Sequence, residues 1–201
     1  MVTKRKYELK ERARRQEETR RRITEATVAL HETVGPAHTQ ISEIARRAGV
    51  ERLTVYKHFP DADSLFHACS AHWRAAHPPP DPEPWNEIAD PRLRTRTALD
   101  AVYAYFGENE PMLANIIRDA ESMPVLRQHL ESGSLAYAVG VRDLILAGWR
   151  VRGRRHDRLA TVIDLALGFR TWQFLRRRQG MTNDEAAELM LSLIRCTAQP
   201  P

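Results

Sequence analysis

The sequence has few of the residues that mark secreted or membrane-spanning proteins. Its 201 residues include two cysteines, Cys69 and Cys196, which lie far apart and form no CxxC pair. We therefore expect no disulfide and interpret both as small core residues in a reducing compartment. No window approaches the roughly 20 uninterrupted apolar residues of a membrane-spanning helix, and the N-terminal end is charged where a secretory signal needs an apolar segment. The sequence thus predicts a cytoplasmic protein with no membrane partner.

Motifs of catalysis and of β-sheets are also missing. There is no glycine-rich phosphate loop, no GxSxG, no HExxH and no strand-like alternation of apolar and polar residues. Apolar residues make up 42% of the chain, enough to bury a core in one or two domains. We predict an all-α protein that is not an enzyme and uses no cofactor. A catalytic role for the C-terminal helices remains a minor alternative.

Positive charge is concentrated at the N-terminal end. Residues 1–60 hold 14 Lys and Arg against 8 Asp and Glu, whereas residues 61–201 hold 17 against 18. A basic end on a nearly neutral body predicts that this end meets a polyanion, with nucleic acid the leading candidate. The alternative is a charged face that is only solvated.

The first helix has two parts. Glu and Arg at four-residue offsets favour helix from residue 7 onward, but an apolar stripe appears only later, so we expect a frayed start and a packed helix from about Thr19. Gly35-Pro36 ends the segment. The stripe consists of Ile23, Ala26, Thr27, Leu30 and Val34.

The stretch TQISEIARRAGVERLTVYKHF, residues 39–59, has the spacing of a helix-turn-helix. Thr39 can cap the first helix and Gly49 supplies the tight turn. In the second helix Val55 and Phe59 face inward, which leaves a polar, basic and aromatic outer face. The inward positions of the first helix are Ile41, Ile44, Ala45 and Ala48.

The rest of the chain is predicted to be a second helical domain. A helix over 62–77 packs back on the first helices, and PPPDPEP at 78–84 is a stiff spacer. We therefore place a DNA-binding domain at 1–77, a linker at 78–84 and a ligand-binding and dimerisation domain at 85–201. Further helices are expected near 90–108, 110–121, 123–151, 156–178 and 183–197.

The last two expected helices are apolar on more than one side. A domain of this size cannot easily bury both sides, so we predict a two-fold dimer in which paired helices form a four-helix bundle. The alternative is that these helices are central in the monomer. Phe174 is expected on the internal side with Leu159 and Ile163. The predicted dimer residues are Val162, Leu165, Phe169, Trp172, Leu189 and Leu193.

Residues 39–65 contain one further pattern, which consists of Thr39, Ile44-Ala45, Ala48-Gly49-Val50, Thr54, Tyr56, Phe59-Pro60 and Leu65. This pattern resembles the DNA-binding signature of the TetR/AcrR family of transcriptional regulators. The resemblance implies an N-terminal three-helix, homeodomain-like helix-turn-helix domain and a homodimer that binds successive major grooves of a palindromic operator. It also implies a small-molecule effector in the C-terminal domain that releases DNA, which makes the protein a repressor.

Three positions depart from the family pattern. Glu51 stands where a capping Ser is common, Leu53 where a small residue is frequent, and Ala62 where a Lys often contacts phosphate. We expect the basic arm to replace the lost phosphate contact by lying along the backbone or entering the minor groove. Its cations include Lys4, Arg5, Lys6, Arg12, Arg14 and Arg15.

The expected DNA contacts divide by chemistry. Arg52 and Lys57 can reach guanine edges, Thr54 and Ser42 are short donors, and Leu53 is an apolar reader of a thymine methyl. The side chains suited to phosphate oxygens are Thr39, Arg46, Tyr56 and His58. The alternatives are that Thr39 only caps, Tyr56 only packs and Arg46 is solvated, or that the whole motif binds protein rather than DNA.

Candidate effector contacts are aromatic, methionine, isoleucine and histidine side chains of the second domain. Such residues line small-molecule pockets, although they also make ordinary cores. They indicate a hydrophobic or aromatic effector. The candidates are Tyr103, Phe106, Met112, Ile116, His129, Tyr137 and Trp149.

A metal site is not expected. His67, Cys69, His72 and His77 are all potential ligands, but offsets of two and five residues do not share a helix face. We interpret Cys69 as core and the histidines as partly exposed.

Overall fold

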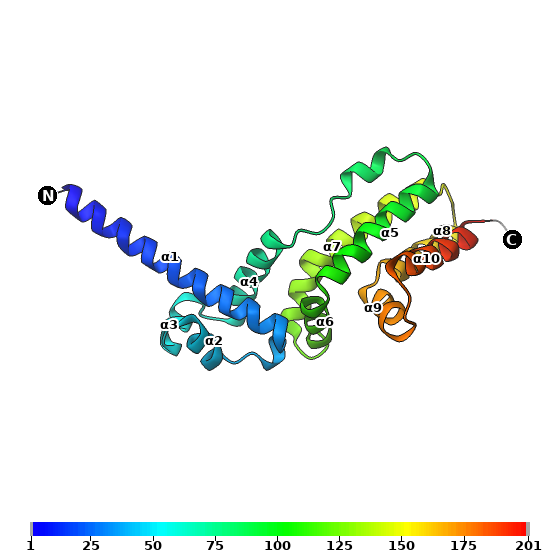
Figure 1. The fold of residues 1–201 in the computed structure, drawn as a ribbon. Helices are drawn as coiled ribbons and strands as arrows, with labels where there is room; N and C mark the ends of the chain where they lie inside the picture. The colour runs from blue at the N-terminus through cyan, green and yellow to red at the C-terminus, as the bar shows by residue number, and fades with distance from the viewer. Residues whose placement is uncertain (1, 200–201) are drawn as a thin grey trace. The chain divides into compact units, whose positions relative to one another are not determined.

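The computed structural model describes the backbone of residues 2–199, and the side chains of all of these except 2–6, 132 and 134. The described residues form helices and no strand. They cluster into two compact units (Figure 1). The first unit contains Met1–Pro78 and Ala114–His129, and the second contains Pro79–Leu113 and Leu130–Pro201.

Four helices build the N-terminal part of the first unit. They are α1 (Val2–Thr33), α2 (Ile41–Ala48), α3 (Arg52–His58) and α4 (Ala62–Ala76), with a short 3₁₀ turn at Pro36–His38. α1 packs against both α2 and α4, and α2 packs against α3. Their shared core confirms most of the predicted inward positions, with Ile23, Ile44, Val55 and Phe59 each at most 3% exposed.

α1 begins at Val2, so the segment before Thr19 is helical as predicted; it has no Gly or Pro and carries Glu–Arg pairs such as Glu11–Arg14. Two other details of this region differ from expectation. Val34 is 43% exposed and lies past the helix end, not in the apolar stripe. Thr39 does not cap α2: Gln40 occupies that position, and the Thr39 hydroxyl donates to the carbonyl oxygen of Gly35 (2.8 Å).

The second unit is built around helices α5, α8 and α10. The 3₁₀ turn Glu83–Glu87 leads into α5 (Pro91–Glu108), and α10 (Asn183–Ala198) packs against both α5 and α8 (Arg154–Leu167). Two further helices, α6 (Glu110–Asp119) and α7 (Pro124–Gly148), contribute residues to both units. The central side chains of the second unit are fully buried: Leu99, Tyr103, Ile145, Leu159, Ile163 and Ile194.

The helix expected over 156–178 is interrupted. α8 ends at Leu167, Gly168 adopts an extended conformation (φ −73°, ψ 125°), and α9 (Phe169–Gln173) begins beyond it. A π-helical turn, Phe174–Arg178, follows. Both irregularities change which side of the helix each later residue faces, so the single apolar pattern read from the sequence does not hold past Gly168.

No helix within residues 2–199 is long and apolar enough to cross a membrane.

Candidate nucleic-acid interface

A left-handed glycine sets the angle between α2 and α3. Gly49 has φ 63° and ψ 43°, and its N–H donates to the carbonyl oxygens of Ala45 and Arg46, which closes the end of α2. Val55 and Phe59 then bury the inner side of α3. The short helix is therefore held by its apolar side, and its opposite side faces solvent.

The outer face of α3 carries the predicted DNA-reading residues. Arg52, Leu53, Tyr56 and Lys57 are all exposed, and even the apolar Leu53 and the aromatic Tyr56 are 61% and 46% exposed. The structure thus brings together cationic, aromatic and apolar side chains on one short helix. Thr54 and His58 are half-buried at its edge.

Two arginines of α1 fasten the helix-turn-helix. Arg20 donates to the carbonyl oxygen of His58 (2.7 Å), and its guanidinium lies 4.1 Å from the centre of the Phe59 ring. Arg22 donates to the carbonyl oxygen of Ala48 (2.8 Å). These bonds satisfy carbonyls at the C-terminal ends of α3 and α2. Part of the N-terminal positive charge therefore has a structural role.

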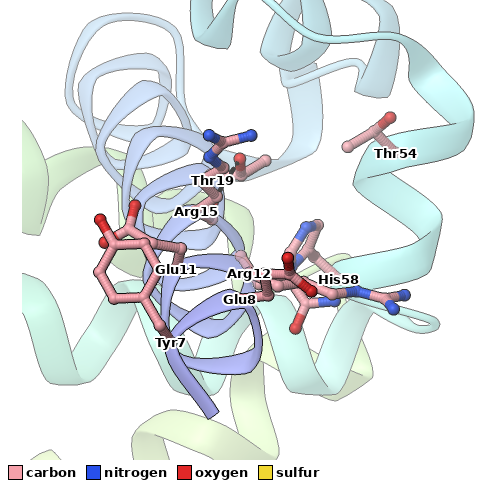
Figure 2. A pocket seen from close by; sticks show the side chains of 9 residues that line it. Tyr7, Glu8, Glu11, Arg12, Arg15, Thr19, Thr54 and His58 are labelled. Carbon is pink, nitrogen blue, oxygen red and sulfur yellow. Dashed lines mark hydrogen bonds between the residues drawn. The ribbon is translucent and has the colours of Figure 1, made fainter. Parts of the chain in front are cut away.

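An open pocket of about 540 Å³ lies where the exposed half of α1 passes α3. Figure 2 shows Arg12, Arg15 and Thr19 of α1 around it, together with Thr54 and His58 of α3. The remaining lining residues are Tyr7, Glu8, Glu11 and Gln16. The arm and the recognition helix therefore share one surface. The side chains of Lys4, Arg5 and Lys6 lie outside the described ones.

The predicted contacts on α2 have internal partners. Arg46 makes two hydrogen bonds with the Glu43 carboxylate (2.6 and 2.8 Å), and Arg47 makes a third (3.0 Å). These bonds, Arg46 first, lower the pKa of Glu43 to about 2. Ser42 is exposed, with its hydroxyl 3.4 Å from the Gln40 amide oxygen. Arg46 stays solvent-accessible, but a phosphate would compete there with Glu43.

The structure shows the surroundings of two positions that depart from the family pattern, Glu51 and Ala62. Glu51 is the N-cap residue of α3 and makes no side-chain cap hydrogen bond, so it can act only through the helix dipole. α4 is capped by Asp61, which accepts a hydrogen bond from the N–H of Ser64 (2.8 Å). Ala62 itself is exposed and offers no donor side chain.

Polar contacts that the sequence did not predict join α6 to the last turn of α1 and to the turn that follows it. Asn115 donates to the carbonyl oxygens of His31 and Glu32 (3.0 and 2.8 Å), and the Asp119 carboxylate accepts from the N–H of Ala37 (2.9 Å). Asp119 is 4% exposed; burial raises its pKa, but bonds from Arg118 and Ala37 outweigh burial and leave it lowered. In the sequence, Gly35 is the residue that could have pointed to an unusual turn here, and in the structure its φ is +91°.

The seven predicted effector residues do not gather in one unit. Ile116 and His129 belong to the first unit and the other five to the second. In the second unit, Tyr103 is fully buried, and its hydroxyl donates to the carbonyl oxygen of Ala166 (2.8 Å). Met112 is also buried, and the remaining three are half-buried. Phe106 packs on other rings, Tyr137 donates to the carbonyl oxygen of Pro80, and Trp149 donates to the Thr95 hydroxyl.

The six predicted dimer residues fall into two groups. Leu165, Leu189 and Leu193 are 53%, 38% and 42% exposed, and Val162 is half-buried. Phe169 and Trp172 instead lie inside the unit at 7% and 1% exposure, packed on the ring of Phe106. Phe174, expected inside, is 50% exposed. The break at Gly168 explains why Phe169 and Trp172 are inside and Phe174 is outside, because it turns α9 inward.

The four residues weighed as metal ligands have separate surroundings. Cys69 is 4% exposed, and burial raises the pKa of its thiol to about 12. The ring of His67 lies against that of His129, and the ring of His77 stacks on Trp73. His72 is exposed. Among the described residues, no group of three potential ligands is close enough to hold a metal ion.

Comparison with known families identifies the helix-turn-helix. Residues 23–69, from the packed half of α1 to α4, match the model of bacterial regulatory proteins of the tetR family. No curated protein sequence matches the chain significantly.

Similar solved structures span almost the whole chain. NalD, the secondary repressor of the MexAB-OprM multidrug efflux pump in Pseudomonas aeruginosa, is 25% identical with a TM-score of 0.60, over 90% of this chain and 95% of that one. A candidate fatty acid metabolism regulator from Clostridium perfringens is 15% identical with a TM-score of 0.62, over 90% and 100%. A TetR-like regulator from Rhodococcus sp. RHA1 is 17% identical with a TM-score of 0.59, over 88% and 93%. The N-terminal domain therefore carries the DNA-binding helix-turn-helix of the TetR family of transcriptional regulators, and the chain as a whole has the fold of solved TetR-family regulators.

Proposed function

We propose that this regulator is a homodimeric repressor that binds a palindromic operator and is released by a small hydrophobic or aromatic effector. The observation that carries the proposal is the outer face of α3, where Arg52, Leu53, Tyr56 and Lys57 are exposed on a helix anchored by Val55 and Phe59. An exposed recognition helix with these side chains suits the major groove. The role of NalD as a repressor supports the same sign of regulation.

Base reading and phosphate binding would be divided within this face. Arg52 and Lys57 present donors to guanine edges, Thr54 and Ser42 add short hydroxyl contacts, and Leu53 meets a thymine methyl. Phosphate oxygens would be held from the edges of the motif. The phosphate-binding residues are Thr39, Arg46, Tyr56 and His58.

The exposed half of α1 adds a second set of phosphate contacts. Arg12 and Arg15 line the pocket shared with Thr54 and His58 of α3, so a DNA strand in that pocket would meet both elements. This supplies the cations missing at Ala62. Glu8 and Glu11 line the same pocket and limit its positive charge. We therefore expect the pocket to hold the phosphate backbone of one DNA strand.

Dimerisation would use exposed apolar side chains of α8, the π-helical turn and α10. Leu165, Phe174, Leu189 and Leu193 are each at least 38% exposed in one chain, which is costly for side chains of this size. A second copy packed on them in a four-helix bundle would bury them. Phe169 and Trp172 take no part, because they are already buried within the unit.

Effector release would act by population shift, with α6 as the connection. This helix contributes residues to both compact units, and its last turn is bonded to the segment around Gly35 and Ala37. An effector that favours one position of α6 would thus bias the placement of the helix-turn-helix. α4, which leads out of the same domain, would follow.

The proposal is tested by titrating purified protein with duplexes from the DNA flanking its own gene, then with single-base variants of any protected palindrome. Arg52→Ala should cost roughly 1 to 3 kcal/mol at one base position and little elsewhere. Equal loss on every sequence would reassign Arg52 to phosphate binding. Failure to prefer any duplex over the others would refute operator recognition. Arg178→Gln, on the second unit, serves as the control.

A further inference from the structure

The loop after α7 and the first five residues of α8 together hold the largest group of neighbouring cations in the second unit. Residues 150–158 contain five arginines and one acidic residue, Asp157. All five arginines are described: four are exposed and Arg155 is half-buried. The summed charge of residues 61–201 hides this cluster, because acidic residues elsewhere cancel it. The arginines are Arg150, Arg152, Arg154, Arg155 and Arg158.

These arginines differ from most others in the same unit. Arg96 pairs with Asp100, Asp184 and Glu188, and Arg177 binds the Glu110 carboxylate. By contrast, no side-chain hydrogen bond or ion pair joins the five arginines to any described residue, including the acidic residues between Asp81 and Asp90. Asp157 contacts His156 instead.

Fold stability does not account for the cluster. Three of the arginines lie in the first five residues of α8, where the positive end of the helix dipole disfavours cations. The helix also has no side-chain cap, since Gly153 occupies the N-cap position. Arg150 adopts φ +50°, a conformation that favours glycine or asparagine over arginine. A segment selected only for folding would have avoided all three features.

We propose that residues 150–158 form a second, sequence-independent contact for the phosphate backbone of duplex DNA. Arginine suits this partner because its planar guanidinium donates two parallel hydrogen bonds to phosphate oxygens. DNA is chosen over other polyanions because a regulator held at its operator meets a high local concentration of duplex phosphates. The choice of DNA as the polyanion rests on the proposed function, whereas the observation that these arginines are unpaired is independent of it. The contact would raise the lifetime of the protein on DNA without adding sequence information.

The test measures the salt dependence of binding to a duplex without a palindrome, in a full-length background carrying Tyr56→Ala and Lys57→Ala. This background lacks two of the proposed contacts of α3 and the duplex has no palindrome, so the experiment does not depend on operator recognition. Each lost phosphate contact lowers the slope of log K against log salt by about 0.9. Arg152→Gln should lower the slope by about that amount, and Arg152→Gln with Arg154→Gln by about twice as much.

Two controls separate charge placement from charge loss. Arg178→Gln removes one exposed cation outside the cluster and should leave the slope unchanged. Arg152→Lys with Arg154→Lys keeps the charge and should retain the slope of the background. Thermal midpoints that match the background establish that the variants fold, as expected for side chains without internal partners.

Equal slopes for Arg152→Gln and Arg178→Gln would overturn the proposal. So would an unchanged DNA slope combined with lost binding to phosphatidylglycerol vesicles, which would assign the cluster to a lipid surface. If the wild-type protein also shows no operator preference, the proposed function fails, yet the slopes in the α3-disabled background still decide the role of the cluster.

Discussion

The carboxylate of Asp119 accepts a hydrogen bond from the backbone N–H of Ala37, 82 positions earlier in the chain (2.9 Å). Because Asp119 is 4% exposed, Asp119→Ala would leave that N–H without its buried partner. We expect the free energy of unfolding to fall by about 1 to 3 kcal/mol, measured by urea denaturation. Glu32→Ala, which removes an exposed carboxylate near the same turn, should change it by less than about 0.5 kcal/mol. Similar small effects of both changes would contradict this role of Asp119.

Burial of His31 predicts a pH dependence of stability. Desolvation lowers its pKa from 6.5 to about 4, against the opposing charge of Asp119. Between these values the unfolded chain binds a proton that the folded chain does not, so stability is complete above pH 6.5 and is lost as the pH falls towards 4. The loss approaches about 3 kcal/mol. Urea denaturation at a series of pH values should show this slope in the protein and in His38→Gln, but not in His31→Gln.

The arm should contribute to DNA affinity through charge alone. Deleting residues 1–16 removes its cations, and Arg12→Gln with Arg15→Gln removes the two that line the pocket beside α3. The double substitution should lower the slope of log K against log salt by about 1.8 on every duplex tested. Arg21→Gln is the control, since Arg21 is held by Glu18 and Glu25. An unchanged slope after the deletion would remove the arm from the interface.

Charge placed on the exposed leucines should prevent dimerisation. Leu189→Glu puts a carboxylate where a second chain would have to bury it, so sedimentation should show a monomer whose operator affinity is strongly reduced. Leu93→Glu alters an equally available leucine on α5, 56% exposed, and should leave the dimer intact. A dimeric Leu189→Glu protein would place the interface elsewhere.

The sequence predicted the helix-turn-helix well because its determinants are local. The spacing of Ile44, Val55 and Phe59 decides which side of each short helix is buried, and Gly49 has one conformational role that no other residue fills as easily. The exposed positions on α3 follow from the same spacing. Residue spacing alone is therefore enough to assign the proposed DNA contacts of α3 to its solvent-facing side.

The second unit was harder to predict because its determinants are not local. The extended Gly168 and the π-turn at Phe174–Arg178 exchange the sides of Trp172 and Phe174, and no periodicity signals either change. The first unit has one non-local feature of this kind, because the bonds from Asn115 and Asp119 of α6 to the end of α1 and the turn after it span more than 80 residues. The unpaired arginines at 150–158 do not appear in the net charge of residues 61–201, because acidic residues elsewhere in this stretch cancel them.

The continuity of α1 has an energetic consequence. Fixing a disordered cationic tail on a duplex costs roughly 1 to 2 kcal/mol of backbone entropy per residue. Here the basic segment continues a helix, Val2 to Thr33, whose other half is packed in the core. Binding DNA in this helical conformation would cost less backbone entropy than ordering a disordered tail, so less of the attraction between its guanidiniums and the phosphates would be offset.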